Sequence, residues 1–239
     1  MLLGSHPTAM GAFYVECDEA HLGDLGRRLV ALAGPAMSLL LGAVAYAALM
    51  RVARNNRAGW LFTWLLGSLG LMSAAGYPLF SGVSGLGDLG TIADGALGGW
   101  TPQWPWRVGM TALGVIGYRA VLRVMWRAMA PQLGARDPAA LKRQLRGVAL
   151  PAYATGALVY LAIGLLNPLG LEMILLSVLP SSLGGSCGLL LFWQQARRAP
   201  VLADGGGPGL GFGRSMPWIG AAGLVVLAYA ALFGPTLRG

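Results

Sequence analysis

The sequence predicts an all-α polytopic membrane protein with about six transmembrane helices, and three observations support this class. Apolar residues make up 56% of the 239 residues, and charged residues only 11%, whereas globular chains are roughly 25% charged. Five windows lack Asp, Glu, Lys and Arg, and each reaches the about 20 residues that span a bilayer core. These windows are residues 29–50, 58–87, 147–171, 173–196 and 215–237. Soluble enzymes and secreted disulfide scaffolds do not have this pattern.

The charge balance points to the lipid bilayer as the main partner. The formal net charge is +8, from 17 Lys and Arg against 9 Asp and Glu. Basic loops anchor helices at anionic lipid. No basic run is interleaved with aromatic residues, so no nucleic-acid partner is expected. Cys17 and Cys187 are the only cysteines, and they form no CxxC pair, so neither a disulfide framework nor a cysteine zinc site is indicated.

The chain is expected to divide into a polar N-terminal segment, residues 1–28, and a single helical transmembrane domain, residues 29–239. In the first segment, the run Gly11-Ala12-Phe13-Tyr14-Val15 consists of β-type residues and predicts a strand of a small hairpin. Hydropathy and the positions of charges place the helical spans at about residues 29–50, 60–80, 107–129, 147–166, 170–193 and 216–234.

The second span and the segment after it have unusual compositions. Trp60 and Trp64 stand at the beginning of the span, where aromatic side chains suit a membrane interface. A glycine-rich loop is expected after the span, over residues 81–106, and it contains Asp88 and Asp94 but no basic residue.

The loops between spans alternate in charge. Segments 51–57, 123–146 and 197–214 are basic, whereas 81–106 and 167–170 are not. Because basic residues in short loops favour the cytoplasmic side, this pattern predicts a multi-pass protein with both termini outside, in a bacterial-type plasma membrane.

Ala33-Gly34-Pro35 lies at the beginning of the first span. Proline is tolerated near a helix start, because its missing N–H would have no intrahelical partner there. The neighbouring glycine allows another helix to approach closely. The motif is therefore either a packing notch or part of a functional site.

Gly76-Tyr77-Pro78 closes the second span and is followed by Gly87-Asp88. A carboxylate directly after an apolar span is costly if it is dry and unpaired. Asp88 is therefore a candidate ligand or proton-handling group, and the alternative is a turn residue in contact with water. Asp94, followed by another glycine, has the same ambiguity.

The order of a β-type segment, Ala33-Gly34-Pro35, Gly76-Tyr77-Pro78 and Gly87-Asp88 resembles the site-2 protease family of intramembrane zinc metalloproteases, over roughly residues 10–95. In that family a helix carrying H-E-x-x-H comes first and a β-containing segment follows. The next span begins with a Gly-Pro motif, and a later span supplies an Asp as the third zinc ligand.

The resemblance implies roles for individual residues of this chain. Asp88 would be the third zinc ligand, with Asp94 as the weaker alternative. It also implies zinc as the cofactor of intact relatives and a membrane protein as the substrate. The accompanying structural motif would consist of Gly34, Pro35, Gly76, Tyr77 and Gly87.

The chain departs from the family at the catalytic motif. It contains no H-E-x-x-H, so it lacks the histidines and the general base of zinc hydrolysis. We expect this chain alone to be inactive and to bind no zinc. It is either a fragment whose missing N-terminal helix carried the motif or a degenerate, non-proteolytic relative. A small transporter and a non-catalytic structural membrane protein remain as alternatives.

Overall fold

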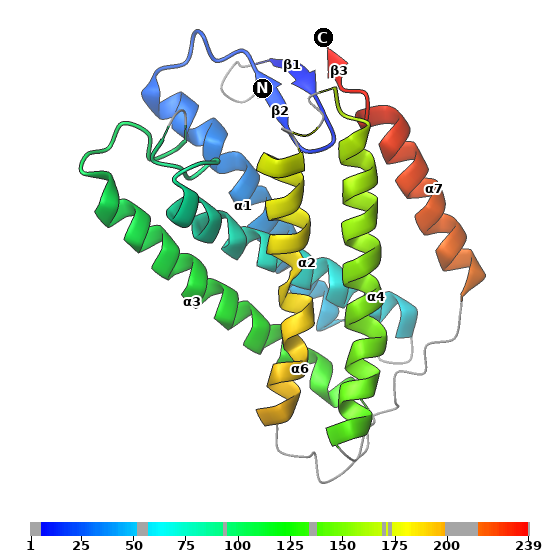
Figure 1. The fold of residues 1–239 in the computed structure, drawn as a ribbon. Coiled ribbons are helices and arrows are strands. Elements are labelled where there is room, and N and C mark those ends of the chain that lie inside the picture. The colour runs from blue at the N-terminus through cyan, green and yellow to red at the C-terminus, as the bar shows by residue number, and fades with distance from the viewer. Residues whose placement is uncertain are drawn as a thin grey trace.

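A computed structural model describes residues 6–51, 57–92, 95–133, 138–168, 171, 174–198 and 215–238. The described residues form a helical bundle with a small sheet at one end (Figure 1). The long helices are α1 (Asp24–Leu49), α2 (Arg57–Ser84), α3 (Gln103–Met129), α4 (Pro138–Leu165) and α7 (Met216–Phe233). The shorter helical segments are the 3-10 turn η1 (Ala130–Gln132), the π-helix η2 (Ile174–Gly184) and α6 (Gly188–Arg198). The predicted all-α class is confirmed.

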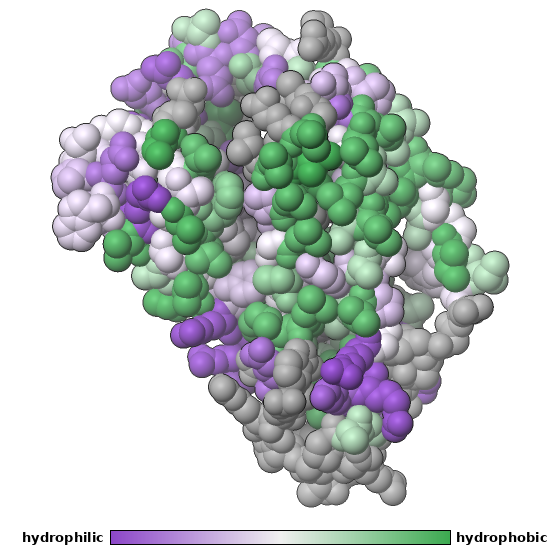
Figure 2. All heavy atoms as spheres, in the orientation of Figure 1, coloured by the Kyte–Doolittle hydropathy of each residue, from purple (hydrophilic) through white to green (hydrophobic). Residues whose placement is uncertain are grey.

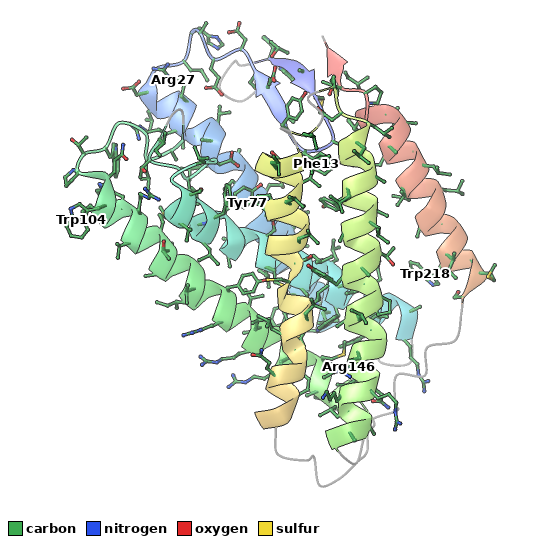
Figure 3. All side chains as sticks on the ribbon, viewed as in Figure 1. Phe13, Arg27, Tyr77, Trp104, Arg146 and Trp218 are labelled. Atoms are coloured by element: carbon green, nitrogen blue, oxygen red, sulfur yellow. The ribbon has the colours of Figure 1, made fainter. Side chains whose placement is uncertain are left out.

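Among the described residues, five helices are long and apolar enough to cross a membrane. They are the five long helices named above, so the prediction of a multi-pass membrane protein is confirmed. Figure 2 shows the corresponding surface, on which apolar residues form a broad band and hydrophilic residues gather at its two ends. Arg146 lies at the end opposite the small sheet (Figure 3).

The span expected at residues 170–193 is not one long α-helix. The structure divides it into η2 and α6, which both pack beside α4 (Figure 1). Pro180 lies inside η2, and proline removes a backbone donor from a helix interior. The two segments still make one crossing. Strand β1 precedes the first helix and pairs with β3, which follows the last one, so both ends of the helical bundle's chain lie on the same side. This requires an even number of crossings. The five long described helices supply an odd number, and η2 with α6 supplies the sixth.

The sheet has the strand order β2-β1-β3. Strands β1 (Pro7–Met10) and β2 (Val15–Cys17) form an antiparallel hairpin. The prediction of a strand over residues 11–15 was therefore displaced: residues 11–14 make the turn, which the Gly11 N–H closes by donating to the Tyr14 carbonyl at 2.9 Å. Strand β3 (Leu237–Arg238) pairs antiparallel with β1, a pairing that no local pattern indicated.

The hairpin turn is tied to the helices beneath it. The Phe13 ring packs against Tyr160 of α4, with 5.5 Å between the ring centroids, and the Tyr229 hydroxyl of α7 donates to the Ala12 carbonyl. The side chain of Asn167 donates to the Thr236 hydroxyl at 3.3 Å. The sheet is therefore fixed to several segments that are distant in sequence.

The core lies where α2, α3, α4 and α6 meet. Trp64 is 1% exposed, its indole N–H donates to the Met125 carbonyl at 2.9 Å, and its ring packs against Phe192. Trp60 is also buried. The prediction that these two tryptophans mark a membrane interface was wrong, because both rings pack in the interior of the bundle.

Candidate functional site

The segment after α2 forms a compact loop built on glycine. Gly85 and Gly87 have φ of +80° and +82°, a conformation that side chains other than glycine rarely adopt. The N–H of Thr91 donates to the Gly85 carbonyl at 3.0 Å, and the N–H of Ala96 donates to the Asp88 carbonyl at 2.8 Å. The glycine-rich loop, expected over residues 81–106, is shorter, because α2 ends at Ser84 and α3 begins at Gln103. Its described part forms turns that fix the backbone at Asp88.

Two arginines outside the loop hold it against the bundle. Arg28 of α1 donates to the Ala96 carbonyl and to the Gly98 carbonyl, the latter at 3.0 Å, and its guanidinium lies 5.4 Å from the centre of the Trp100 ring. Arg107 of α3 donates to the Gly82 carbonyl at 3.2 Å. Sequence reasoning missed both contacts, because the only local signal was an arginine near each helix start.

The loop places Asp88 against Gly34, in the interior of α1. A side-chain carbon on Gly34 would lie 3.1 Å from Asp88 Oδ2 and 3.5 Å from Tyr77 Oη. Asp88 is half-buried, whereas Gly34 is exposed. The three motifs that the sequence singled out therefore converge, and the absence of a side chain at Gly34 leaves room for the two oxygens.

The helices extend further than the sequence suggested, which changes the setting of both prolines. Helix α1 begins at Asp24, so Pro35 lies in its interior and not at the helix start; it removes the N–H that would bond the Ala31 carbonyl. Helix α2 continues through Pro78 to Ser84, so the expected helix end near Gly76-Tyr77-Pro78 was wrong.

The other glycines of the motif have distinct surroundings. A side-chain carbon on Gly87 would lie 3.3 Å from Ser81 Oγ, and one on Gly76 would lie 3.9 Å from the Gly185 Cα. Gly76 thus faces the junction between η2 and α6. Asp94 lies outside the described residues, so the structure does not place it.

The described residues do not by themselves fit a zinc site. Within them, no group of three or more His, Cys, Asp and Glu side chains is close enough to hold a metal, and a catalytic zinc needs three protein ligands. Asp88 supplies one carboxylate at this position. The site as described can offer a single metal ligand or proton acceptor, beside the Tyr77 hydroxyl.

Burial raises the pKa of the Asp88 carboxyl. An acid whose pKa is higher in the folded state binds protons more readily there. The protonated Asp88 carboxyl therefore stabilises the folded state fully below the pKa of the unfolded chain, about 4, and this stabilisation is lost as pH rises through the pKa of the folded state. The ionised Asp88 carboxylate therefore opposes folding at neutral pH relative to a neutral side chain at the same position.

Asp88→Asn is expected to make the folded protein more stable than the unmodified chain at pH 7 and equally stable below about pH 4, where the Asp88 carboxyl is protonated in both the folded and the unfolded state. Unfolding in a detergent titration at the two pH values measures this. Asp24→Asn is the control, since Asp24 is exposed and paired with Arg27 at 2.7 Å, and exposed pairs contribute little. Lower stability of Asp88→Asn than of the unmodified chain at pH 7 would contradict a raised pKa of Asp88.

Comparisons of this chain with family models, with curated proteins and with solved structures find no match.

Proposed function

We propose that this chain is the membrane scaffold of a site-2-protease-like metalloprotease, in which Asp88 is the carboxylate ligand of zinc, and that the chain by itself does not catalyse proteolysis. The observation that carries the proposal is that Asp88 Oδ2 and Tyr77 Oη both lie beside Gly34, where a side-chain carbon would be in contact with them. The resemblance concerned only the order of these motifs along the chain. Their meeting in space is an independent support.

The electrostatics of Asp88 support the same role. The carboxyl is half-buried and its pKa is raised, and no described basic side chain pairs with it. A metal ion that binds the carboxylate would offset the free energy lost on burial. The remaining ligands would have to come from a helix that carries H-E-x-x-H, and the exposed face of α1 at Gly34 is where such a helix would have to lie.

The test adds a helix that carries H-E-x-x-H. The full chain is expressed behind a transmembrane helix that carries H-E-x-x-H, purified in detergent, and titrated with zinc against a chromophoric chelator. We expect about one tightly bound zinc per chain. Asp88→Asn should weaken binding by more than about 100-fold, because even residues that only orient a ligand contribute 10- to 100-fold.

Two controls make the result specific. Asp24→Asn removes an exposed carboxylate at the start of α1 and should leave the zinc affinity unchanged. A fusion with both motif histidines replaced by alanine should bind no zinc tightly. Equal zinc affinity of the Asp88→Asn fusion and its parent would exclude Asp88 as a ligand.

A small transporter is the second candidate, and the interrupted helix between η2 and α6 is the observation that favours it. Transporters often bind substrate where a helix is broken near the bilayer midplane. Here the Tyr118 hydroxyl of α3 donates to the Gly185 carbonyl and accepts from the Gly188 N–H, both at 2.7 Å. The Gly185 carbonyl and the Gly188 N–H are therefore already paired and are not available to a substrate, which favours the first candidate.

A further inference from the structure

A groove of about 670 Å³ follows the outer face of α3. Its walls are mainly apolar and come from residues one helical turn apart, from Trp104 through Val108 and Ala112 to Ile116. Val108 is 61% and Ile116 67% exposed, whereas the opposite face of α3 is buried in the core. The groove therefore faces the surroundings of the bundle.

The floor of the groove offers no unpaired hydroxyl. The Thr111 hydroxyl donates to the Arg107 carbonyl of its own helix at 2.8 Å, so it is already satisfied. Gly82 of α2 forms the adjacent floor, and a side-chain carbon there would lie 2.4 Å from Thr111 Oγ1. The absence of that carbon keeps α2 close to α3 and the groove apolar along its length.

One end of the groove is charged and aromatic. Arg107 lines it and uses two of its N–H groups for the carbonyls of Gly82 and Val83. A guanidinium has five N–H donors, and no acidic side chain pairs with Arg107 among the described residues. Trp104 stands beside it and points away from the bundle (Figure 3), as aromatic side chains do at membrane interfaces.

The length of the groove matches one leaflet. From Arg107 to Ile116 a helix rises about 14 Å at 1.5 Å per residue, which is roughly half of the about 30 Å hydrocarbon core. An acyl chain that starts beside Arg107 would follow the apolar wall past Val108 and Ala112 to Ile116, near the bilayer midplane. Its headgroup would then lie at Arg107.

We propose that this groove binds one anionic phospholipid, with an acyl chain along Val108, Ala112 and Ile116 and the phosphate on the remaining N–H groups of Arg107. A partner helix would suit the apolar wall. It would leave those N–H groups without an anion, and arginine forms its strongest hydrogen bonds with phosphate and carboxylate. This site is independent of Asp88 and of the function proposed above.

Native mass spectrometry of the purified full chain tests the proposal with phosphatidylglycerol and phosphatidylcholine of identical acyl chains. We expect one phosphatidylglycerol to bind about fivefold more tightly than phosphatidylcholine, since a basic residue near the surface contributes about 1 kcal/mol toward anionic lipid. Inorganic phosphate at millimolar concentration should not displace it. Arg107→Gln should remove the preference between the two lipids.

Ala112→Phe fills the groove and should weaken binding of both lipids at least about tenfold, because the acyl chain and the ring compete for the same space. Ala112 is exposed, so the bundle should tolerate the ring. Ala222→Phe on α7, where the alanine is also exposed, is the matched control and should leave the binding of both lipids unchanged.

Three results would overturn the proposal. Unchanged lipid binding by Ala112→Phe would show that the lipid lies elsewhere. Displacement by inorganic phosphate would identify a site for the free anion. A dimer of the chain that Ala112→Phe disrupts, without a bound lipid, would identify a protein helix as the occupant.

Discussion

Gly114→Ala is expected to destabilise the folded bundle by about 1–3 kcal/mol, the range typical of overpacking in a close-packed interior. A side-chain carbon on Gly114 would lie 2.5 Å from the Leu79 backbone nitrogen and 2.6 Å from the Leu79 Cα. These are backbone atoms of α2, so no rotamer change can relieve the clash. The methyl group can be accommodated only if α2 and α3 move apart, and this contact is one of the two most extensive in the bundle.

Gly109→Ala is the matched control in the same helix. Apart from its chain neighbours and the backbone of its own helix, no described heavy atom lies within 4 Å of a side-chain carbon at Gly109, and alanine is favoured over glycine inside a helix by roughly 0.5–1 kcal/mol. The control should therefore be neutral or stabilising. Equilibrium unfolding in mixed detergent measures both variants. Equal midpoints for the two would show that α2 and α3 do not pack at Gly114.

Tyr118→Phe is expected to destabilise the protein by about 2–6 kcal/mol, because it leaves two backbone groups inside the bundle without partners, at about 1–3 kcal/mol each. The hydroxyl bonds the Gly185 carbonyl and the Gly188 N–H at the junction between η2 and α6. Water and lipid do not replace such bonds inside a membrane protein. Hydrogen exchange of the Gly188 amide should accelerate together with the loss of stability.

Tyr46→Phe is the control for this substitution. Tyr46 is half-buried and packs against the same core, but its hydroxyl has no hydrogen bond within the part of the chain that the structure describes. Its loss should change stability by less than about 0.5 kcal/mol. If the Gly188 amide of Tyr118→Phe exchanged as slowly as in the Tyr46→Phe control, the tyrosine would not be closing the helix break.

The candidate site was accessible to sequence reasoning in part. The sequence showed Gly34, Tyr77 and Asp88 in a recognisable order along the chain, and the structure adds that they lie together. The surroundings were not predictable. Arg28 reaches the loop after α2 across many intervening residues, and a contact of that kind leaves no periodic pattern in the sequence.

The helical crossings themselves follow from local information. A long stretch without charges must place its backbone hydrogen bonds within itself when it enters lipid, and only a helix does this with one segment. The predicted spans overlap the observed helices, but the helices are longer, and α4 begins at Pro138 and not at residue 147. The span expected at residues 170–193 also differs, because the backbone around Pro180 adopts the π-helical turns of η2.

The arrangement of the crossings is set by tertiary contacts. Lipid is as apolar as a protein core, so hydropathy does not distinguish a lipid-facing side chain from a buried one. Trp60 and Trp64 are buried although their positions suited an interface. Gly109 and Gly114 occupy one helix, yet only Gly114 meets a neighbouring backbone. Close approach, hydrogen bonds across the bundle and the closing of β3 on β1 decide these differences, because they depend on which segments meet and not on the composition of any one of them.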